Sequence, residues 1–164
     1  MISAIVAVDK DWGIGYQGQL LEHLPPDMKY FKELTTNHVV VMGRRTWDSL
    51  PNKPLKDRLN LVITSGERQY GEMTCFIGMA EAMARLAHVD DDEEWFIIGG
   101  GTIYKELLPI CDRVYVTKIE KYHKNIDTYF PNLDKDSNWE VSTCTELRDY
   151  KDIPYAFLTY DRIS

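Results

Sequence analysis

Short apolar segments rich in Val and Ile alternate along the chain with stretches whose apolar positions recur at helical spacing. Runs such as VVVM and FII are apolar on both faces, which is typical of strands in a sheet that helices cover on both sides. We expect eight strands, at residues 3–8, 38–42, 60–64, 74–77, 95–99, 112–119, 139–144 and 155–160. We expect four helices, at residues 26–35, 44–50, 79–87 and 102–108.

The order of these elements indicates the fold class. Strands and helices alternate as far as residue 112, and from there strand follows strand. The first part predicts an α/β fold with a mostly parallel sheet, and the last part predicts a hairpin whose edge strand is antiparallel. The 164 residues contain no repeat and no linker, so we expect a single domain over 1–164. The acidic run at 88–95 is interpreted as a solvated turn.

Charge and composition exclude several classes of protein. A net charge of −7 argues against nucleic-acid binding, which needs a basic surface. No apolar run approaches the roughly 20 residues of a membrane helix. The first ten residues lack the basic start of a signal peptide, so we expect a cytoplasmic protein without a membrane segment. No strong exposed apolar stripe is evident, and we expect a monomer.

The cysteines and histidines do not form a recognisable metal or disulfide pattern. Cys75, Cys111 and Cys144 are odd in number and far apart, which favours free thiols in a reducing compartment. The four histidines have no spacing typical of zinc ligands. We therefore predict no metal site.

Two strand-to-helix junctions carry groups that suit phosphate. In VVVMGRRTWDSL, Gly43 ends a strand, and Arg44, Arg45 and Thr46 open a helix whose N–H groups point outward. In FIIGGGTIYKELL, the glycines at 99–101 allow the backbone to approach a pyrophosphate closely. A solvated arginine pair and a plain tight turn are the respective alternatives.

A third junction, NLVITSGER, ends a strand at Thr64, Ser65 and Gly66, with Arg68 nearby. Hydroxyl groups and an arginine at this position suit a 2′-phosphate and favour NADP over NAD. An ordinary polar turn is the alternative.

Asp27 is the residue whose position most strongly indicates chemistry. At about 100° per residue, it falls on the apolar face of its predicted helix between Leu34 and Phe31, and Lys29 falls on the opposite face. Prolines precede it at the first helical positions, so Asp27 lies inside the helix and is not its cap. A buried ion pair with an arginine is one explanation. A carboxylate at the bottom of a cleft, facing a planar cationic or amidine-like ligand, is the other.

The segment between the first strand and this helix has three glycines and little periodicity. A loop of this length in a small domain is often a mobile cover over a binding site. We call residues 9–23 the lid.

Together these segments resemble the dihydrofolate reductase family over nearly the whole chain. The matching segments are IVAV at 5–8, WGIG at 12–15, LPPDMKYFK at 24–32, VVMGRRTWDSL at 40–50, PLKDR at 54–58, VITS at 62–65, FIIGGGTIY at 96–104, VYVTKI at 114–119 and DTYFP at 127–131. Each segment alone is weak evidence for the resemblance, but all nine occur in the order in which the family has them.

The resemblance implies a mainly parallel eight-stranded sheet with four flanking helices. It also implies NADPH-dependent reduction of 7,8-dihydrofolate to 5,6,7,8-tetrahydrofolate, with hydride transfer to pterin C6 and protonation at N5. Asp27 matches the acid that pairs with the pterin, Thr117 matches the threonine that supports this acid, and Leu20 lies in the lid where the family often has Met or Leu. The family also has a cis peptide at the position of Gly99 and Gly100.

The resemblance further assigns binding residues. Arg58 matches the arginine that binds the carboxylate of the glutamate tail. The remaining substrate-binding positions are Ile5, Val6, Ala7, Met28, Phe31, Leu50, Leu55 and Ile98. The cofactor-binding positions are Ala7, Ile14, Gly43, Arg44, Arg45, Thr46, Thr64, Ser65, Gly100, Gly101, Thr102, Ile103 and Tyr104.

Two positions depart from the family pattern. Leu21 and Glu22 stand where the family usually has Pro-Trp, and Glu22 is expected either to repel Asp27 and raise a pKa or to point into solvent. Ile126 stands where a glycine is common, which puts contacts between Asp127 and the lid in doubt.

The nearest alternative is another NADPH-dependent reductase of the same fold, such as the pyrimidine reductase of riboflavin synthesis. Asp27 and Arg58 favour the folate reaction. A non-catalytic nucleotide- or folate-binding module is a second alternative, and it would not need an acid on an apolar face beside a long lid.

Overall fold

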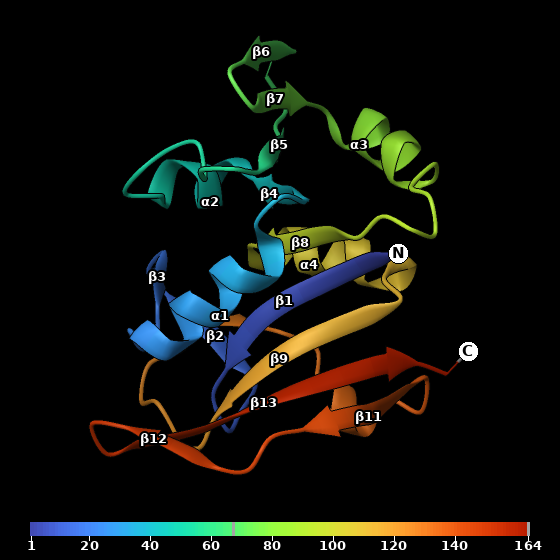
Figure 1. The fold of residues 1–164 in the computed structure, drawn as a ribbon. Helices are drawn as coiled ribbons and strands as arrows, with labels where there is room; N and C mark the ends of the chain where they lie inside the picture. Colours follow the sequence, from blue (N-terminus) through green and yellow to red (C-terminus); the bar gives the residue numbers. More distant parts are fainter. Residues whose placement is uncertain (67, 164) are drawn as a thin grey trace.

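The computed structural model describes residues 1–66 and 68–163, and within them the main feature is a ten-stranded sheet (Figure 1). The predicted strands are present as β1 (Ile2–Val8), β4 (Val39–Gly43), β5 (Leu59–Ile63), β7 (Thr74–Ile77), β8 (Trp95–Gly99), β9 (Arg113–Ile119), β11 (Trp139–Cys144) and β13 (Ile153–Arg162). Two short strands that the pattern did not predict, β6 (Gln69–Gly71) and β12 (Arg148–Tyr150), extend this sheet.

The strand order is β11-β13-β9-β1-β8-β4-β5-β7-β6, and β12 also pairs with β13. Figure 1 shows this order from β11 at the bottom to β6 at the top. The central pairs between β9 and β7 are parallel, whereas β13 runs antiparallel to β9. The predicted α/β fold with an antiparallel C-terminal end is therefore confirmed, and β11 and β12 flank β13 on its outer side.

The four predicted helices are confirmed within about one residue at each end. They are α1 (Pro25–Thr35), α2 (Arg44–Ser49), α3 (Met79–Leu86) and α4 (Gly101–Leu107), and two 3₁₀ turns follow at Leu108–Ile110 and Leu133–Lys135.

Alternating side chains of β4 show that the helices cover both faces of the sheet. Val41 packs in one cluster with Leu86 of α3 and Leu107 of α4. Val40 packs in a second cluster, on the opposite face, with Phe31 of α1. Helices on both sides explain why this strand is apolar on both faces.

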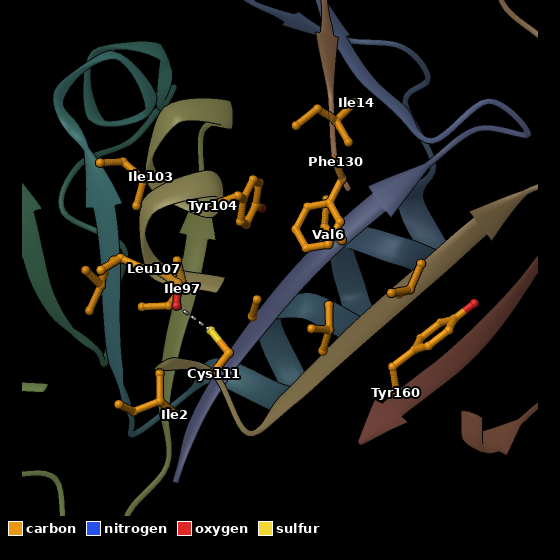
Figure 2. Packing of buried hydrophobic residues seen from close by; sticks show 14 of the residues in the cluster. Ile2, Val6, Ile14, Ile97, Ile103, Tyr104, Leu107, Cys111, Phe130 and Tyr160 are labelled. Atoms are coloured by element: carbon orange, nitrogen blue, oxygen red, sulfur yellow. Dashed lines mark hydrogen bonds between the residues drawn. The ribbon is translucent and has the colours of Figure 1, made fainter. Parts of the chain in front are cut away.

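The hydrophobic cluster that contains Val41 also includes aromatic rings and a thiol (Figure 2). The rings of Tyr104 and Phe130 meet edge to face with centroids 5.0 Å apart. Cys111 donates a hydrogen bond through Sγ to the Leu107 carbonyl at 3.3 Å, and burial raises its pKa to about 12. Its thiol is thus an inert part of the core. Cys75 and Cys144 are also free thiols.

The lid contains regular structure that the sequence pattern did not predict. β2 (Gly13–Tyr16) pairs with β3 (Gln19–Leu20) and with β10 (Thr128–Tyr129) to make a small antiparallel sheet. These strands are too short to give a periodic signal. None of the helices in the described part of the chain is long and apolar enough to cross a membrane.

Candidate active site

A cleft of about 970 Å³ opens at the carboxyl ends of β1, β4 and β8. In this sheet β8 lies between β1 and β4, although it follows both in the chain. Ligands of open α/β folds bind at such crevices beyond the strand ends. The topology therefore places a ligand site where three of the sequence motifs end.

Most of the predicted cofactor positions line this cleft. They are Ala7, Ile14, Gly43, Arg44, Arg45, Thr46, Gly100, Gly101, Thr102, Ile103 and Tyr104. Val6 and Ile98, which were assigned to the substrate, line it as well, and so does Leu20 of the lid. Thr64 and Ser65 follow the end of β5 but are not among the residues that line it.

Gly43 allows α4 to approach β4. A Cβ atom at Gly43 would lie only 2.8 Å from Cγ1 of Ile103, so a larger residue would push α4 away from the strand.

The helices α2 and α4 begin directly beyond β4 and β8, and their first N–H groups are available to a ligand. The peptide between Gly99 and Gly100 is cis, as the resemblance implied.

Arg44 and Arg45 are both exposed at the start of α2. Arg44 lies over the ring of Phe76, 5.4 Å from its centroid, and its Nε donates to Asp48 at 3.2 Å. The pair is therefore on the surface, as the alternative reading expected, but it also lines the cleft.

Asp27 lies half-buried on α1, on the helix face that the projection assigned to it. Its Oδ1 accepts a hydrogen bond from Oγ1 of the buried Thr117 at 2.5 Å. Burial raises the pKa of Asp27, and the Thr117 hydrogen bond opposes this rise in part. The structure thus shows a carboxyl group supported by a hydroxyl donor from β9 and not the buried Asp–Arg pair considered as an alternative.

Several apolar positions assigned to the substrate gather in one cluster with Phe31, which lies one turn after Asp27 on α1. Phe31, Leu50, Leu55 and Ile98 pack in one cluster around buried Ile5. Met28, in contrast, is 49% exposed, and Leu20 on the lid is 70% exposed. Tyr104 is buried and donates its hydroxyl to the carbonyl of Ile5 at 2.7 Å, which joins α4 to β1.

Arg58 is held in a fixed orientation with little exposure. Its Nε donates to the carbonyl of Lys56 at 2.8 Å, and one terminal nitrogen donates to Oγ1 of Thr35 at 3.1 Å. Its guanidinium carbon lies 5.9 Å from the ring centroid of Phe31. Burial lowers the pKa of Arg58, with an opposing effect of Asp57, but an arginine keeps its charge in proteins.

Comparison with known proteins assigns the chain to a family. The family model of dihydrofolate reductase matches residues 1–162. The chain belongs to the dihydrofolate reductase family. It is 38% identical over 165 residues to the dihydrofolate reductase of Bacillus subtilis (strain 168), which covers 99% of the chain and 95% of that protein. It is also 38% identical over 160 residues to the enzyme of Staphylococcus aureus (strain Mu50 / ATCC 700699), which covers 96% of the chain and 95% of that protein.

A solved structure agrees with this assignment. The chain superposes with a TM-score of 0.85 on the dihydrofolate reductase from Enterococcus faecalis complexed with NADP(H) and RAB-propyl, at 32% identity, covering 100% of the chain and 97% of the neighbour.

The lid keeps its contacts with the segment that follows β9 in spite of Ile126. Asp127 accepts a hydrogen bond at Oδ2 from the backbone N of Gln17 at 2.8 Å, and its own N donates to Gly15 at 3.1 Å. The bond from Gln17, together with one from Oγ1 of Thr128 at 2.9 Å, lowers the pKa of Asp127. The contacts that the departure from the family pattern put in doubt are present.

Sequence reasoning missed several residues that line the cleft. They are Gly15, Gln17, Gly18, Ser49, Ile63, Asp127 and Thr128. The DTYFP motif contains Asp127 and Thr128, so their family match was a usable signal. The short lid strands give no such signal.

Glu22 adopts neither of the two orientations that the sequence suggested. Its Oε1 accepts hydrogen bonds from Nζ of Lys121 at 2.7 Å and from Nε2 of His123 at 2.9 Å. Partial burial opposes ionisation of Glu22, but these two bonds and their positive charges outweigh it, and its pKa is lowered. The carboxylate of Glu22 is therefore engaged by the segment after β9, whereas that of Asp27 is engaged by Thr117.

Proposed function

We propose that the cleft and the adjoining pocket around Asp27 catalyse the NADPH-dependent reduction of 7,8-dihydrofolate to 5,6,7,8-tetrahydrofolate. The observation that carries this proposal is the hydrogen-bonded pair of Asp27 and Thr117, in which Thr117 pairs in register with Ala7 at the wall of a cleft rich in backbone and arginine donors. Family membership over residues 1–162 supports the same activity.

The residues of the cleft fit a dinucleotide with three phosphates. Gly43, Gly100 and Gly101 leave room for a pyrophosphate at the starts of α2 and α4. Arg44 and Arg45 supply charge-assisted donors. Thr46, Thr102 and Ile103 complete the phosphate-binding surface, and Thr64 and Ser65 at the end of β5 bind the 2′-phosphate. When bound, NADPH supplies the hydride that passes to C6 of the pterin.

The nicotinamide side of the cleft is apolar and close to the lid. We assign Ala7, Ile14 and Tyr104 to this ring, with Leu20 closing over it. All four line the cleft. Exclusion of bulk water there strengthens the local electrostatic interactions at the reacting atoms.

Asp27 orients the pterin by accepting hydrogen bonds from N3 and the 2-amino group. Because it binds this side of the ring, it is a positioning and electrostatic group for N5, and a water molecule delivers the proton. Thr117 keeps the carboxylate in place. A raised pKa suits a carboxyl group that exchanges charge with a bound heterocycle near neutral pH.

The remaining substrate is held by apolar contacts and one cation. Ile5, Val6, Phe31, Leu50, Leu55 and Ile98 enclose the pterin and benzoyl rings, and Met28 covers them at the surface. Arg58 binds the carboxylate of the glutamate tail in a bidentate manner through N–H groups not used by its bonds to Lys56 and Thr35, and these two bonds hold the guanidinium in a fixed orientation.

We further infer that the protein acts as a cytoplasmic monomer. The free thiols Cys75, Cys111 and Cys144 are compatible with a reducing compartment. Sedimentation of the purified protein across a range of concentrations tests the oligomeric state, and a concentration-dependent increase in mass would contradict a monomer.

The activity is tested by the loss of NADPH absorbance with dihydrofolate as substrate. A parallel assay uses the diaminopyrimidine substrate of the riboflavin pathway. We expect turnover with dihydrofolate and none with the pyrimidine. Tight NADPH binding without turnover of dihydrofolate would contradict the proposed function and favour a binding module.

A further inference from the structure

Two carboxylates from opposite ends of the lid bind the same histidine. Asp9 follows β1, and its Oδ2 lies 3.2 Å from the backbone N and 3.0 Å from the ring Nδ1 of His123. Glu22 precedes α1, and its Oε1 lies 2.9 Å from Nε2 of His123 and 2.7 Å from Nζ of Lys121. His123 thereby connects residues that are separated by nearly the whole lid.

The other oxygen of Asp9 shapes the first turn of the lid. Its Oδ1 accepts hydrogen bonds from the backbone N of Asp11 at 2.9 Å and of Gly13 at 2.8 Å. The side chain of Asp9 is completely buried, and that of His123 is 12% exposed. A buried anion is tolerated when donors surround it, and Asp9 has four of them.

A count of donors relates the two ring contacts to the protons on the histidine ring. An ionised carboxylate only accepts hydrogen bonds, and a neutral imidazole has a single N–H group. With Asp9 and Glu22 ionised, both contacts are hydrogen bonds only when both ring nitrogens of His123 carry protons. The two anions are then balanced by His123 and Lys121. Lys10, which follows Asp9, and Glu120, which precedes Lys121, face each other at 3.8 Å, and Asp11 and Lys124 are the other charged residues beside Asp9 and His123 in the chain.

The same contacts decide where Glu22 points. Both of its donors lie on the segment that follows β9, and they lower its pKa. Glu22 is only five positions before Asp27, and its backbone leads directly into α1, which carries that acid. Two carboxylates at the same site disfavour each other's ionised form, so the direction of Glu22 matters for the charge of Asp27.

We propose that His123 is a positioning residue for the reductase reaction. By binding Asp9 and Glu22 it fixes both ends of the lid and holds the Glu22 carboxylate away from the substrate acid Asp27. We call Asp9, Glu22, Lys121 and His123 the His123 clamp. The proposal rests on the proposed function of the cleft. Without the clamp, Glu22 is free to turn toward Asp27 and to change the pH dependence of hydride transfer.

Substitutions at His123 separate its two bonds. An asparagine amide reaches the position of Nδ1, so His123→Asn retains a donor to Asp9 and loses the bond to Glu22. A glutamine amide reaches the position of Nε2, so His123→Gln retains the bond to Glu22. His123→Asn therefore leaves Lys121 as the remaining donor to Glu22 and is expected to loosen the position of Glu22, and His123→Gln is the conservative variant that rescues this position. His88→Asn, at an exposed histidine outside the clamp, is the control.

The first experiment is the pH profile of single-turnover hydride transfer from NADPH to dihydrofolate. We expect the midpoint for His123→Asn to move upward by about half a pH unit to one unit, because a Glu22 anion held by Lys121 alone can turn toward Asp27 and favour the protonated form of Asp27. His123→Gln and His88→Asn should keep the wild-type midpoint. The double variant His123→Asn with Glu22→Gln should return to it, since the second carboxylate is then absent. A wild-type midpoint for His123→Asn, or an uncorrected shift in the double variant, overturns the proposal.

The second experiment does not depend on activity. Amide hydrogen exchange of the protein without ligands is measured over lid residues 10–21. Loss of one bond at either end should speed exchange there by about tenfold for both His123→Asn and His123→Gln. Exchange in β4 and β8 should stay unchanged, and so should the lid in His88→Asn. Unchanged lid exchange in both His123 variants contradicts the clamp even if the enzyme proves active.

The third measurement uses the wild-type protein and covers the case in which variants do not fold. Nitrogen chemical shifts of the His123 ring report whether each nitrogen carries a proton. Protons on both nitrogens are the state in which His123 donates to both carboxylates. A single-proton tautomer would mean that one of the two contacts is not a hydrogen bond of this kind, and the proposal would fail. An inactive wild-type enzyme with an intact clamp would instead refute only the proposed function.

Discussion

Ile126 occupies the space that a side chain at Gly13 would need. A Cβ atom at Gly13 would lie 2.6 Å from Cδ1 and 2.9 Å from Cγ2 of Ile126. Gly13 begins β2 of the lid, and Ile126 precedes Asp127, which binds the lid at Gln17. The large residue that departs from the family pattern is therefore accommodated because residue 13 has no side chain.

This pair predicts non-additive effects of substitution. Gly13→Ala should destabilise the protein by about 1–3 kcal/mol, because the new methyl group overpacks against Ile126. Adding Ile126→Ala should recover most of this loss, and the coupling is measured by urea unfolding of both single variants and the double variant. Gly71→Ala, where the nearest heavy atom to the new Cβ is 3.9 Å away, is the control. Strictly additive effects would show that the two residues do not compete for this space.

Asp27→Asn should reduce hydride transfer by about 10²- to 10³-fold near neutral pH, because the neutral amide does not stabilise a cationic pterin. The deficit should narrow in acid, where the substrate arrives already protonated. Single-turnover rates across pH test this prediction. An equal deficit at every pH would indicate a structural role for Asp27.

The same variant has a predicted effect on stability. Burial raises the folded-state pKa of Asp27, so the folded protein binds this proton more tightly than the unfolded chain. The stability of the wild type therefore falls as pH rises from the unfolded pKa through the folded pKa. The free energy of unfolding of Asp27→Asn, relative to wild type, should increase across that window and stay constant above it. A relative stability that decreases with pH would mean that the pKa shift has the opposite sign.

Thr117→Val removes the hydroxyl donor to Asp27 and nearly preserves the side-chain shape. Loss of this donor leaves the carboxyl group less satisfied and should cost about 1–3 kcal/mol in urea unfolding. It should also move the hydride-transfer profile to higher pH, because the bond from Thr117 favours the ionised form. Thr143→Val, on the exposed side of β11, should change neither quantity.

Arg58→Lys tests the assigned binding of the glutamate tail. Lysine keeps the charge but lacks the planar fork, so KM for dihydrofolate should rise by about 10- to 100-fold with a nearly constant kcat. A dihydropteroate substrate without the glutamate tail is the control, and its KM should be the same for both proteins. A rise of equal size for both substrates would place the effect at the pterin pocket.

The sequence determined the elements that have long, regular patterns. Its eight apolar strands and four helices are present, because burial between two helical layers requires apolar runs on both faces of a strand. The helical projection also placed Asp27 on the inner face of α1, since the period of a helix fixes which residues share a face. Two of the three strand-end motifs, at Gly43–Thr46 and Gly99–Tyr104, met in one cleft because carboxyl ends of parallel strands lie at one edge of the sheet, whereas Thr64 and Ser65 of the third motif do not line it.

Other features depend on contacts between distant segments. The short strand β10 forms because residues 128–129 meet residues 13–15, far away in the chain, and this pairing completes the small sheet begun by the local hairpin of β2 and β3. The space shared by Gly13 and Ile126 joins positions far apart in the chain, and no local pattern reports it. Likewise, the sequence allowed Glu22 to face either Asp27 or solvent. Only the tertiary structure brought His123 and Lys121 to it, because hydrogen bonds and charge pairing act through space, across a separation of about a hundred residues.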